Sequence, residues 1–130
     1  MKLIVGYDGS NSAKEALALA ARHSKSFNAS IDVVTSMETG TADEAEKIRQ
    51  AEKELKSIES DLNEKGIENN THLLIRGMRP GEDLVNFAKE NGADAIYIGV
   101  KRRSKIGKLL FGSNATFIIL EAPCPVTLVR

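Results

Sequence analysis

The sequence predicts an α/β fold, a doubly wound sheet of five parallel strands with helices on both faces. Short apolar runs, each about the length of one strand, alternate along the chain with longer segments that have apolar residues at helical spacing. The runs are predominantly apolar on successive residues, which is typical of parallel strands buried on both faces. Strict alternation of the two kinds of segment favours one parallel sheet over separate all-α and all-β parts.

The first half of the chain begins with an apolar run at residues 3–5, which predicts the first strand. Ser12 and Glu15 have the spacing of a capping box, and apolar residues recur at helical spacing from there to Phe27. A helix is therefore expected after the first strand. A β-branched run at residues 31–35 predicts the second strand.

A long charged helix is expected next, from about Asp43 to Glu64, because its apolar residues form a single stripe at helical spacing. Gly66 is placed to end this helix, since glycine readily adopts the left-handed conformation of a helix C-terminus. Residues 72–75 then form the third apolar run and predict the third strand.

The last third of the chain holds two further helices and two further strands. Pro80-Gly81 interrupts the chain before an apolar periodic segment that ends at Asn91-Gly92, as expected of a helix. The remaining elements are a strand at residues 95–100, a short helix at 113–120 and a strand at 126–129. A thirteen-residue basic loop is expected between the fourth strand and the last helix.

Length and composition limit the kinds of function. At 130 residues the chain is expected to form one domain, and its 18 basic and 18 acidic residues balance. No overall positive charge attracts nucleic acid or a membrane surface, and no apolar run approaches the length of about 20 residues that a membrane span needs. Cys124 is the single cysteine, which excludes an internal disulfide and fits a reducing compartment. We therefore expect a cytoplasmic protein.

The loop after the fourth strand has the residue types that bind phosphate. Gly99 ends that strand, cationic residues follow at 101–108, and Gly112-Ser113 opens the next helix. A ligand can approach a glycine backbone closely, and a helix N-terminus offers unpaired N–H groups, here with Ser113 as a cap and phosphate ligand. The spacing alone supports an ordinary basic surface loop equally well.

The loop after the first strand contains Asp8, whose carboxylate can accept hydrogen bonds from a ribose hydroxyl or an adenine amino group. A turn residue preceding Ser10 and Ser12 explains Asp8 equally well. A phosphoryl-accepting receiver domain would use the same aspartate, with Lys101 at the end of the fourth strand. That interpretation fails because no aspartate follows the third strand.

Residues suited to catalysis are scarce. His23 lies in the first helix pattern and His72 in the third strand, so both are expected to be structural. Cys124 lies between two prolines and reads as a small residue at a strand entrance. Neither a cluster with metal-ligand spacing nor a Walker A or Gly-x-Gly-x-x-Gly motif occurs in the sequence. We expect no catalytic residues.

Four segments together resemble one known family, and the resemblance covers essentially the whole chain. They are Ile4-Val5-Gly6-Tyr7-Asp8-Gly9-Ser10, Gly77-Met78-Arg79-Pro80-Gly81-Glu82, Gly92-Ala93-Asp94-Ala95-Ile96-Tyr97-Ile98-Gly99 and Ala122-Pro123-Cys124-Pro125-Val126-Thr127-Leu128-Val129. The family is that of the universal stress proteins. The resemblance implies an adenine nucleotide alpha-hydrolase-like, Rossmann-like fold, and binding of ATP or AMP, with Mg²⁺ or Mn²⁺ arriving on the nucleotide's phosphates.

Nucleotide-binding members of the family carry Gly-x2-Gly-x9-Gly-[Ser/Thr] after the fourth strand. Gly99 and Gly112-Ser113 match this motif in position, but Arg102 replaces its second glycine. A long side chain there can obstruct close approach of a phosphate to the backbone, or its guanidinium can bind the phosphate directly. We predict direct phosphate contact by Arg102. The sequence lies nearer the ATP-binding branch of the family than the branch that lacks the glycine pattern.

The resemblance also implies site residues and a dimer. The nucleotide would lie against the residues that match the family's site, which are Gly6, Tyr7, Asp8, Ser36, Ile98, Gly99, Arg102, Gly112, Ser113 and Asn114. The family forms homodimers through the last strand, here Val126, Thr127, Leu128 and Val129. A second chain covering that strand would protect an apolar sheet edge from other pairing.

Three functions remain open at this point. The first is an adenine-nucleotide-binding regulatory module of the stress response. The second is a slow ATPase, although no positioned base is apparent in the sequence. The third is a nucleotide-free homodimeric scaffold, in which Arg102 marks the loss of nucleotide binding.

Overall fold

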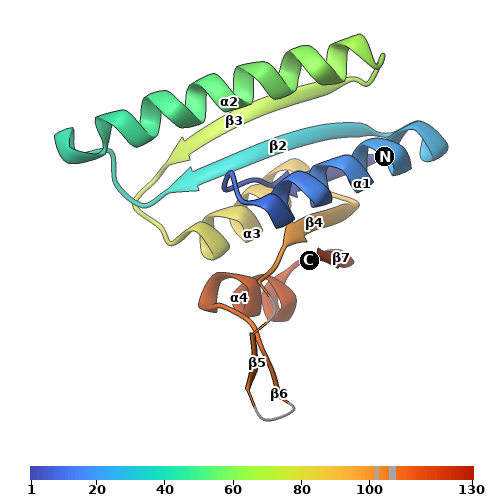
Figure 1. The fold of residues 1–130 in the computed structure, drawn as a ribbon. Coiled ribbons are helices and arrows are strands. Elements are labelled where there is room, and N and C mark those ends of the chain that lie inside the picture. Colours follow the sequence, from blue (N-terminus) through green and yellow to red (C-terminus); the bar gives the residue numbers. More distant parts are fainter. Residues whose placement is uncertain (102, 106–107) are drawn as a thin grey trace.

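A computed structural model of the protein describes residues 1–101, 103–105 and 108–130 (Figure 1). The strands are β1 (Lys2–Gly6), β2 (Ser30–Met37), β3 (Asn69–Ile75), β4 (Ala95–Gly99), β5 (Arg103–Lys105), β6 (Lys108–Leu110) and β7 (Val126–Val129). The helices are α1 (Asn11–Phe27), α2 (Ala45–Glu64), α3 (Pro80–Asn91) and α4 (Ser113–Glu121), with a 3-10 turn, η1 (Ala42–Glu44), before α2.

Five strands form one parallel sheet in the order β3-β2-β1-β4-β7, which confirms the predicted fold class. β1 is central, and Ile4 on it pairs with Asp32 of β2 on one side and Ile96 of β4 on the other. The chain adds β2 and β3 on one side of β1 and then crosses to add β4 and β7 on the other. Strand order therefore reverses between β1 and β4, where doubly wound sheets bind ligands.

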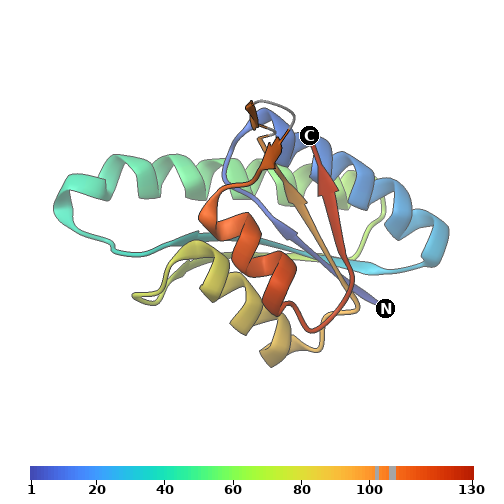
Figure 2. The same ribbon diagram turned by 90° about the horizontal axis from the view of Figure 1, so that it is seen from below.

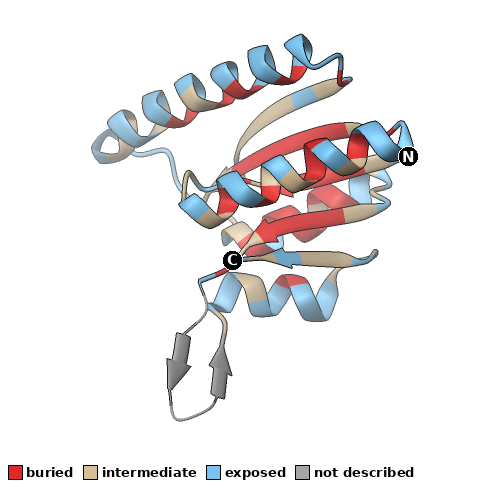
Figure 3. Cartoon of the chain, turned by 45° about the vertical axis from the view of Figure 1, so that its right-hand side comes forward, coloured by how far each residue is buried: buried red, intermediate tan, exposed pale blue. Residues whose placement is uncertain are grey.

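Helices cover both faces of the sheet, α1 and α2 on one side and α3 and α4 on the other (Figure 2). Side chains of β1 alternate between the two layers: Leu3 and Val5 join the core beneath α1 and α2, whereas Ile4 joins the core beneath α3 and α4. The central strands are buried, while the outer faces of the helices are exposed (Figure 3). No helix in the described part of the chain is long and apolar enough to span a membrane.

Ser10, and not Ser12, caps α1, so the predicted capping box is wrong. The Ala13 N–H donates a 3.1 Å hydrogen bond to Ser10 Oγ, and Ser10 has the extended backbone of an N-cap. Because the helix begins at Asn11, Ser12 lies within its first turn, where its hydroxyl contacts that of Ser10 at 3.2 Å. Two serines two residues apart offer alternative caps, and the structure uses the first, which follows Gly9 with its φ of +82°.

The basic segment before α4 contains an antiparallel hairpin, which corrects the prediction of a loop. Arg103 of β5 pairs with Leu110 of β6, and Lys105 pairs with Lys108. Two residues, including Gly107, separate the two short strands in the sequence, and this spacing is typical of a hairpin. The many lysine and arginine residues at 101–108 made this segment look like a surface loop in the sequence.

The start of β3 and the end of α2 can be compared with the predicted bounds. β3 begins at Asn69, three residues before the predicted apolar run, because residues 69–71 pair with residues 31–33 of the longer β2. α2 ends as predicted, with Gly66 in the left-handed conformation at φ of +72°. Its predicted apolar stripe is buried at Ala51, Leu55, Ile58 and Leu62.

Candidate functional site

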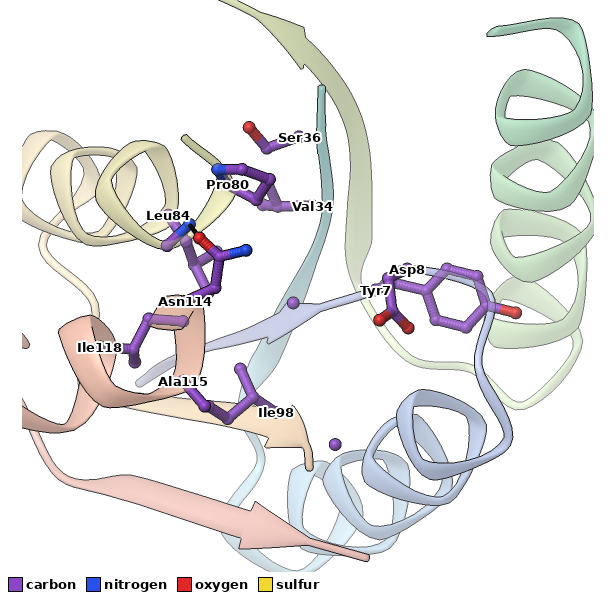
Figure 4. A pocket seen from close by; sticks show the side chains of 13 residues that line it. Tyr7, Asp8, Val34, Ser36, Pro80, Leu84, Ile98, Asn114, Ala115 and Ile118 are labelled. Atoms are coloured by element: carbon purple, nitrogen blue, oxygen red, sulfur yellow. Dashed lines mark hydrogen bonds between the residues drawn. The ribbon is translucent and has the colours of Figure 1, made fainter. Parts of the chain in front are cut away.

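A cavity of about 190 Å³ opens at the carboxyl ends of β1, β2 and β4, between the N-terminal turns of α3 and α4 (Figure 4). It lies where strand order reverses, which is the expected position for a ligand in this fold. The cavity is lined by Gly6, Tyr7, Asp8, Val34, Ser36, Pro80, Gly81, Leu84, Ile98, Gly99, Asn114, Ala115 and Ile118.

The walls of the cavity are mostly aliphatic. Val34, Ile98 and Ala115 point into it from two strands and α4, and Leu84 and Ile118 close its inner end. A cavity of about 150 Å³ in another protein holds one benzene ring. The space is therefore suited to a flat ring system, and the polar parts of a larger ligand would extend out of it.

Gly6 lines the cavity with its backbone and leaves open the space that a side chain would occupy. A Cβ atom added there would lie 2.9 Å from Leu84 Cδ2 and 3.1 Å from Ile98 Cγ2. Any side chain at this position would therefore displace two residues of the wall and occupy the space between them. The absence of a side chain at Gly6 is part of what forms the cavity.

Tyr7 contributes its backbone to the cavity, because its ring points away from it toward α2 (Figure 4). Its N–H donates to the Val34 carbonyl at 2.8 Å, and its carbonyl accepts a 2.7 Å bond from Thr35 Oγ1. Burial raises the pKa of the Tyr7 phenol, and the negative charges of Glu54 and Asp8 raise it further. The ring is a neutral core group.

Asp8 is exposed at the mouth of the cavity, and Oδ1 accepts a 3.0 Å bond from the Ser10 N–H. This bond makes Asp8 a turn residue, as one of the two interpretations of the sequence expected. Oδ2 forms no hydrogen bond within the described residues, so the carboxylate keeps an oxygen for a ligand hydroxyl or amino group. Both expected roles are compatible.

Ser36 lies at the rim of the cavity, and its hydroxyl donates a 2.6 Å bond to Asp83 Oδ2. Arg76 Nε donates to the other carboxylate oxygen of Asp83, also at 2.6 Å, and Arg76 Nη1 reaches Glu90 at 2.9 Å. The hydrogen bond to Glu90 is the largest cause of a raised pKa at Arg76. With its hydroxyl bound to Asp83, Ser36 is left to meet a ligand chiefly through its backbone.

Asn114 joins α4 to α3 beside the cavity. Its Oδ1 accepts a 2.9 Å bond from the Gly81 N–H, one of the amides in the first turn of α3. Arg79, the N-cap of α3, provides no side-chain cap, so Asn114 satisfies an amide that would otherwise lack a partner. The cavity wall therefore depends on a contact between residues 33 positions apart in the sequence.

Gly99 lines the cavity, but packing is the reason that it lacks a side chain. A Cβ atom there would lie 2.6 Å from the Ser12 carbonyl oxygen and still closer to other backbone atoms of Ser12 and Ala13. The first turn of α1 therefore requires glycine at this position, and close approach of a ligand to the Gly99 backbone stays a prediction. A Cβ atom at Gly112 would meet open space.

Gly112 and Ser113 do not line the cavity, although both were predicted as site residues. Ser113 is the first residue of α4 and its N-cap is Gly112, so the predicted capping role of Ser113 is wrong. Ser113 instead lines a neighbouring hollow with Arg79, Glu82, Asn114 and Phe117. Arg102 lies outside the described residues.

The structure brings seven of the ten predicted site residues to one cavity, which are Gly6, Tyr7, Asp8, Ser36, Ile98, Gly99 and Asn114. Sequence reasoning missed the other lining residues, which are Val34, Pro80, Gly81, Leu84, Ala115 and Ile118. Pro80-Gly81 marks the start of α3 and is the one local signal that could have placed this helix at the site.

Both histidines lie away from the cavity, as expected. His23 Nδ1 is 2.6 Å from the Tyr97 hydroxyl, and His72 Nε2 is 2.9 Å from Asp32 Oδ1. Each histidine therefore has a neighbouring side chain as its partner within the fold. Among the residues that the structure describes, no three metal-ligating side chains gather in one place.

The sequence profile of the universal stress protein family matches residues 1–130. A universal stress protein of Thermus aquaticus is 33% identical over 135 residues, which cover 98% of this chain and 97% of that relative.

Solved structures have the same fold. The universal stress protein from Archaeoglobus fulgidus is 37% identical with a TM-score of 0.87, and the match covers 100% of this chain and 98% of that one. An Archaeoglobus fulgidus universal stress protein in complex with dAMP is 34% identical with a TM-score of 0.82, again over 100% and 98%. With a matching profile over its whole length, the chain belongs to the universal stress protein family.

Proposed function

We propose that the protein is an adenine-nucleotide-binding regulatory module of the stress response. The observation that carries this proposal is the cavity at the strand-order reversal, which is apolar, suited to one flat ring system and open at the mouth beside Asp8. The complex of a relative with dAMP supports an adenine nucleotide as the ligand. The base would enter the cavity and the ribose would reach Asp8.

The phosphates would then extend toward the basic segment. Lys101 is exposed and lines a hollow with Arg130 and residues 9–12, at the N-terminus of α1. Helix N-termini attract phosphate through unpaired N–H groups, and nearby cations strengthen the attraction. We propose that Arg102, Gly112 and Ser113 contact the phosphates of ATP or AMP, and that Mg²⁺ or Mn²⁺ enters bound to them.

A homodimer through β7 is part of the proposal. β7 is an edge strand that pairs with β4 on one side, and Leu128 on it is 38% exposed. Pairing with a second copy would satisfy the open backbone edge. Sedimentation velocity should give a dimer for the wild type and a monomer for Leu128→Asp. Ile75→Asp, the matched change on the opposite edge strand, should stay dimeric; a monomeric wild type would contradict the proposal.

The test of nucleotide binding begins with freshly purified protein. The protein is denatured and removed, and the supernatant is separated by ion exchange against a buffer blank; AMP, ATP and GTP are then titrated into nucleotide-free protein. We expect an adenine nucleotide in the supernatant or saturable binding of AMP or ATP, and weaker binding of GTP. No binding at millimolar AMP or ATP would sink the proposal and favour a nucleotide-free scaffold. Turnover above background that Asp8→Ala abolishes would favour the slow ATPase.

The single cysteine bears on the compartment. We propose that the protein acts in the cytoplasm, because a lone cysteine fits a reducing environment. Fractionation of cells that express the protein at its natural level tests this. Recovery in an extracellular or envelope fraction would contradict it.

A further inference from the structure

The orientation of the Asn114 carboxamide is fixed by the main chain of another helix. The Gly81 N–H donates to Oδ1 at 2.9 Å, so the oxygen must face Gly81 and the nitrogen must face the opposite way. Figure 4 shows that the amide nitrogen points from α4 into the cavity, away from the N-terminal turn of α3. The side chain therefore presents a donor to whatever occupies the cavity.

Backbone packing keeps this donor in place. A Cβ atom at Gly81 would lie 2.7 Å from the Asn114 carbonyl oxygen and 2.9 Å from its Cα, so α3 and α4 touch main chain to main chain here. The oxygen end of the carboxamide is held by an amide in the first turn of α3. A donor held on two packed helices is preorganised and loses little conformational entropy when a ligand binds.

The other polar side chains of the cavity each have at least one partner within the described residues, although Asp8 Oδ2 has none. Asp8 Oδ1 accepts from the Ser10 N–H, and Ser36 Oγ donates to Asp83. Asn114 is an exposed residue that lines the cavity, and its Nδ2 forms no hydrogen bond within the described residues. A donor that a ligand desolvates without supplying an acceptor is costly, so this atom discriminates among ligands.

We propose that Asn114 is a specificity-determining residue, whose Nδ2 donates a hydrogen bond to an unprotonated ring nitrogen of the bound purine. This inference rests on the proposed function, because it assumes that an adenine nucleotide occupies the cavity. Adenine carries ring acceptors at N1, N3 and N7, and one of them must meet Nδ2 if the base fills the space. A flat hydrocarbon of the same shape would fit but leave the donor unpaired.

The test uses AMP and its 1-deaza, 3-deaza and 7-deaza analogues, each of which replaces one ring nitrogen by C–H. Their affinities are measured by calorimetry for the wild type and for Asn114→Asp. The carboxylate retains an acceptor for the Gly81 N–H and nearly the same shape, but it loses the donor. Because each analogue is compared with AMP on the same variant, any effect of the new charge on the phosphate cancels.

We expect one analogue to bind the wild type about tenfold more weakly than AMP, the usual loss for one hydrogen bond with a donor left unpaired. In Asn114→Asp that analogue should bind at least as tightly as AMP, because a carboxylate oxygen cannot donate to the ring nitrogen. Equal binding of all four ligands to the wild type would overturn the inference while leaving nucleotide binding intact, and so would an unchanged tenfold loss in Asn114→Asp. Failure of AMP itself to bind would overturn the proposed function with it.

A second readout does not depend on any variant. The side-chain amide protons of Asn114 should shift downfield in the NMR spectrum when AMP binds, and that shift should disappear with the analogue that binds weakly. An Asn114 amide signal that AMP leaves unmoved would also overturn the inference.

Discussion

Ser36 donates a 2.6 Å hydrogen bond to Asp83, a carboxylate with 0% exposure beneath the rim of the cavity. The same carboxylate accepts from Arg76, which follows β3, so one buried charge joins the ends of β2 and β3 to α3. A carboxylate so fully removed from water persists only when it is paired and hydrogen-bonded. The ion pair between Asp83 and Arg76 therefore holds the rim of the cavity in place without lining the cavity itself.

Removing the positive partner of Asp83 should destabilise the fold. Arg76→Met keeps the apolar stem but leaves Asp83 without its charge partner, at an expected cost of about 3 kcal/mol in the free energy of unfolding. Urea unfolding measures this cost. Glu90→Gln is the control, because Glu90 contacts the same arginine from an exposed position and should cost less than about 1 kcal/mol. Equal losses in the free energy of unfolding for the two variants would show that the buried pair stabilises the fold no more than the exposed pair does.

Gly99 and Gly112 should respond differently to alanine. Gly99→Ala forces β4 away from the first turn of α1 and should destabilise the protein by about 3 kcal/mol or prevent folding. The added methyl group of Gly112→Ala meets open space, so this change should alter the free energy of unfolding by less than about 1 kcal/mol. Thermal and urea unfolding of the pair test this. A fully stable Gly99→Ala would mean that α1 and β4 pack less closely than the structure has them.

High pH should weaken the fold through its two tyrosines. Burial raises the pKa of Tyr7 and of Tyr97 above the ordinary value of 10.0, with Glu54 and Asp8 adding to the effect at Tyr7. The unfolded chain then loses its phenolic protons first, so the stabilisation is complete below about pH 10 and is lost as pH rises through the folded pKa values. Absorbance of tyrosinate should appear only above the ordinary pKa, and Tyr7→Phe should flatten the fall in stability. A tyrosine that titrates normally would contradict this.

Arg102 and Ser113 should matter for phosphate and not for the base. Arg102→Ala and Ser113→Ala are each expected to weaken ATP binding by about 1.5 kcal/mol or more, roughly tenfold, because a charged hydrogen bond is lost. Adenosine should bind both variants as it binds the wild type. Calorimetry with ATP and adenosine separates the two effects. Unchanged or tighter ATP binding by Arg102→Ala would refute direct phosphate contact, and equal losses for both ligands would refute it for Ser113.

The fold was predictable because each strand of the parallel sheet and each of the four α-helices carries its own pattern of apolar residues. The β5–β6 hairpin was missed because its short strands are rich in charged residues, which are unusual in strands. The cap of α1 was assigned wrongly because Ser10 and Ser12 both have a residue type that caps helices. Asp8 was predictable from its place after the first strand, whereas Gly6 and Ile98 were implied by the family resemblance; all three line the cavity. The α3 wall was marked only by Pro80-Gly81 at the start of the helix, because the contact between Gly81 and Asn114 is long-range packing that leaves no local pattern.

The most direct test of the central claim is to fill the cavity and measure AMP binding by calorimetry. Ala115 lines the space, so Ala115→Leu should occupy it, whereas Thr116→Leu makes a similar change one residue along α4 at an exposed position. We predict that the wild type and Thr116→Leu bind AMP alike and that Ala115→Leu binds at least about tenfold more weakly, as expected when a side chain takes the place of the base. Wild-type affinity in a folded Ala115→Leu variant would contradict the assignment of this cavity as the adenine site.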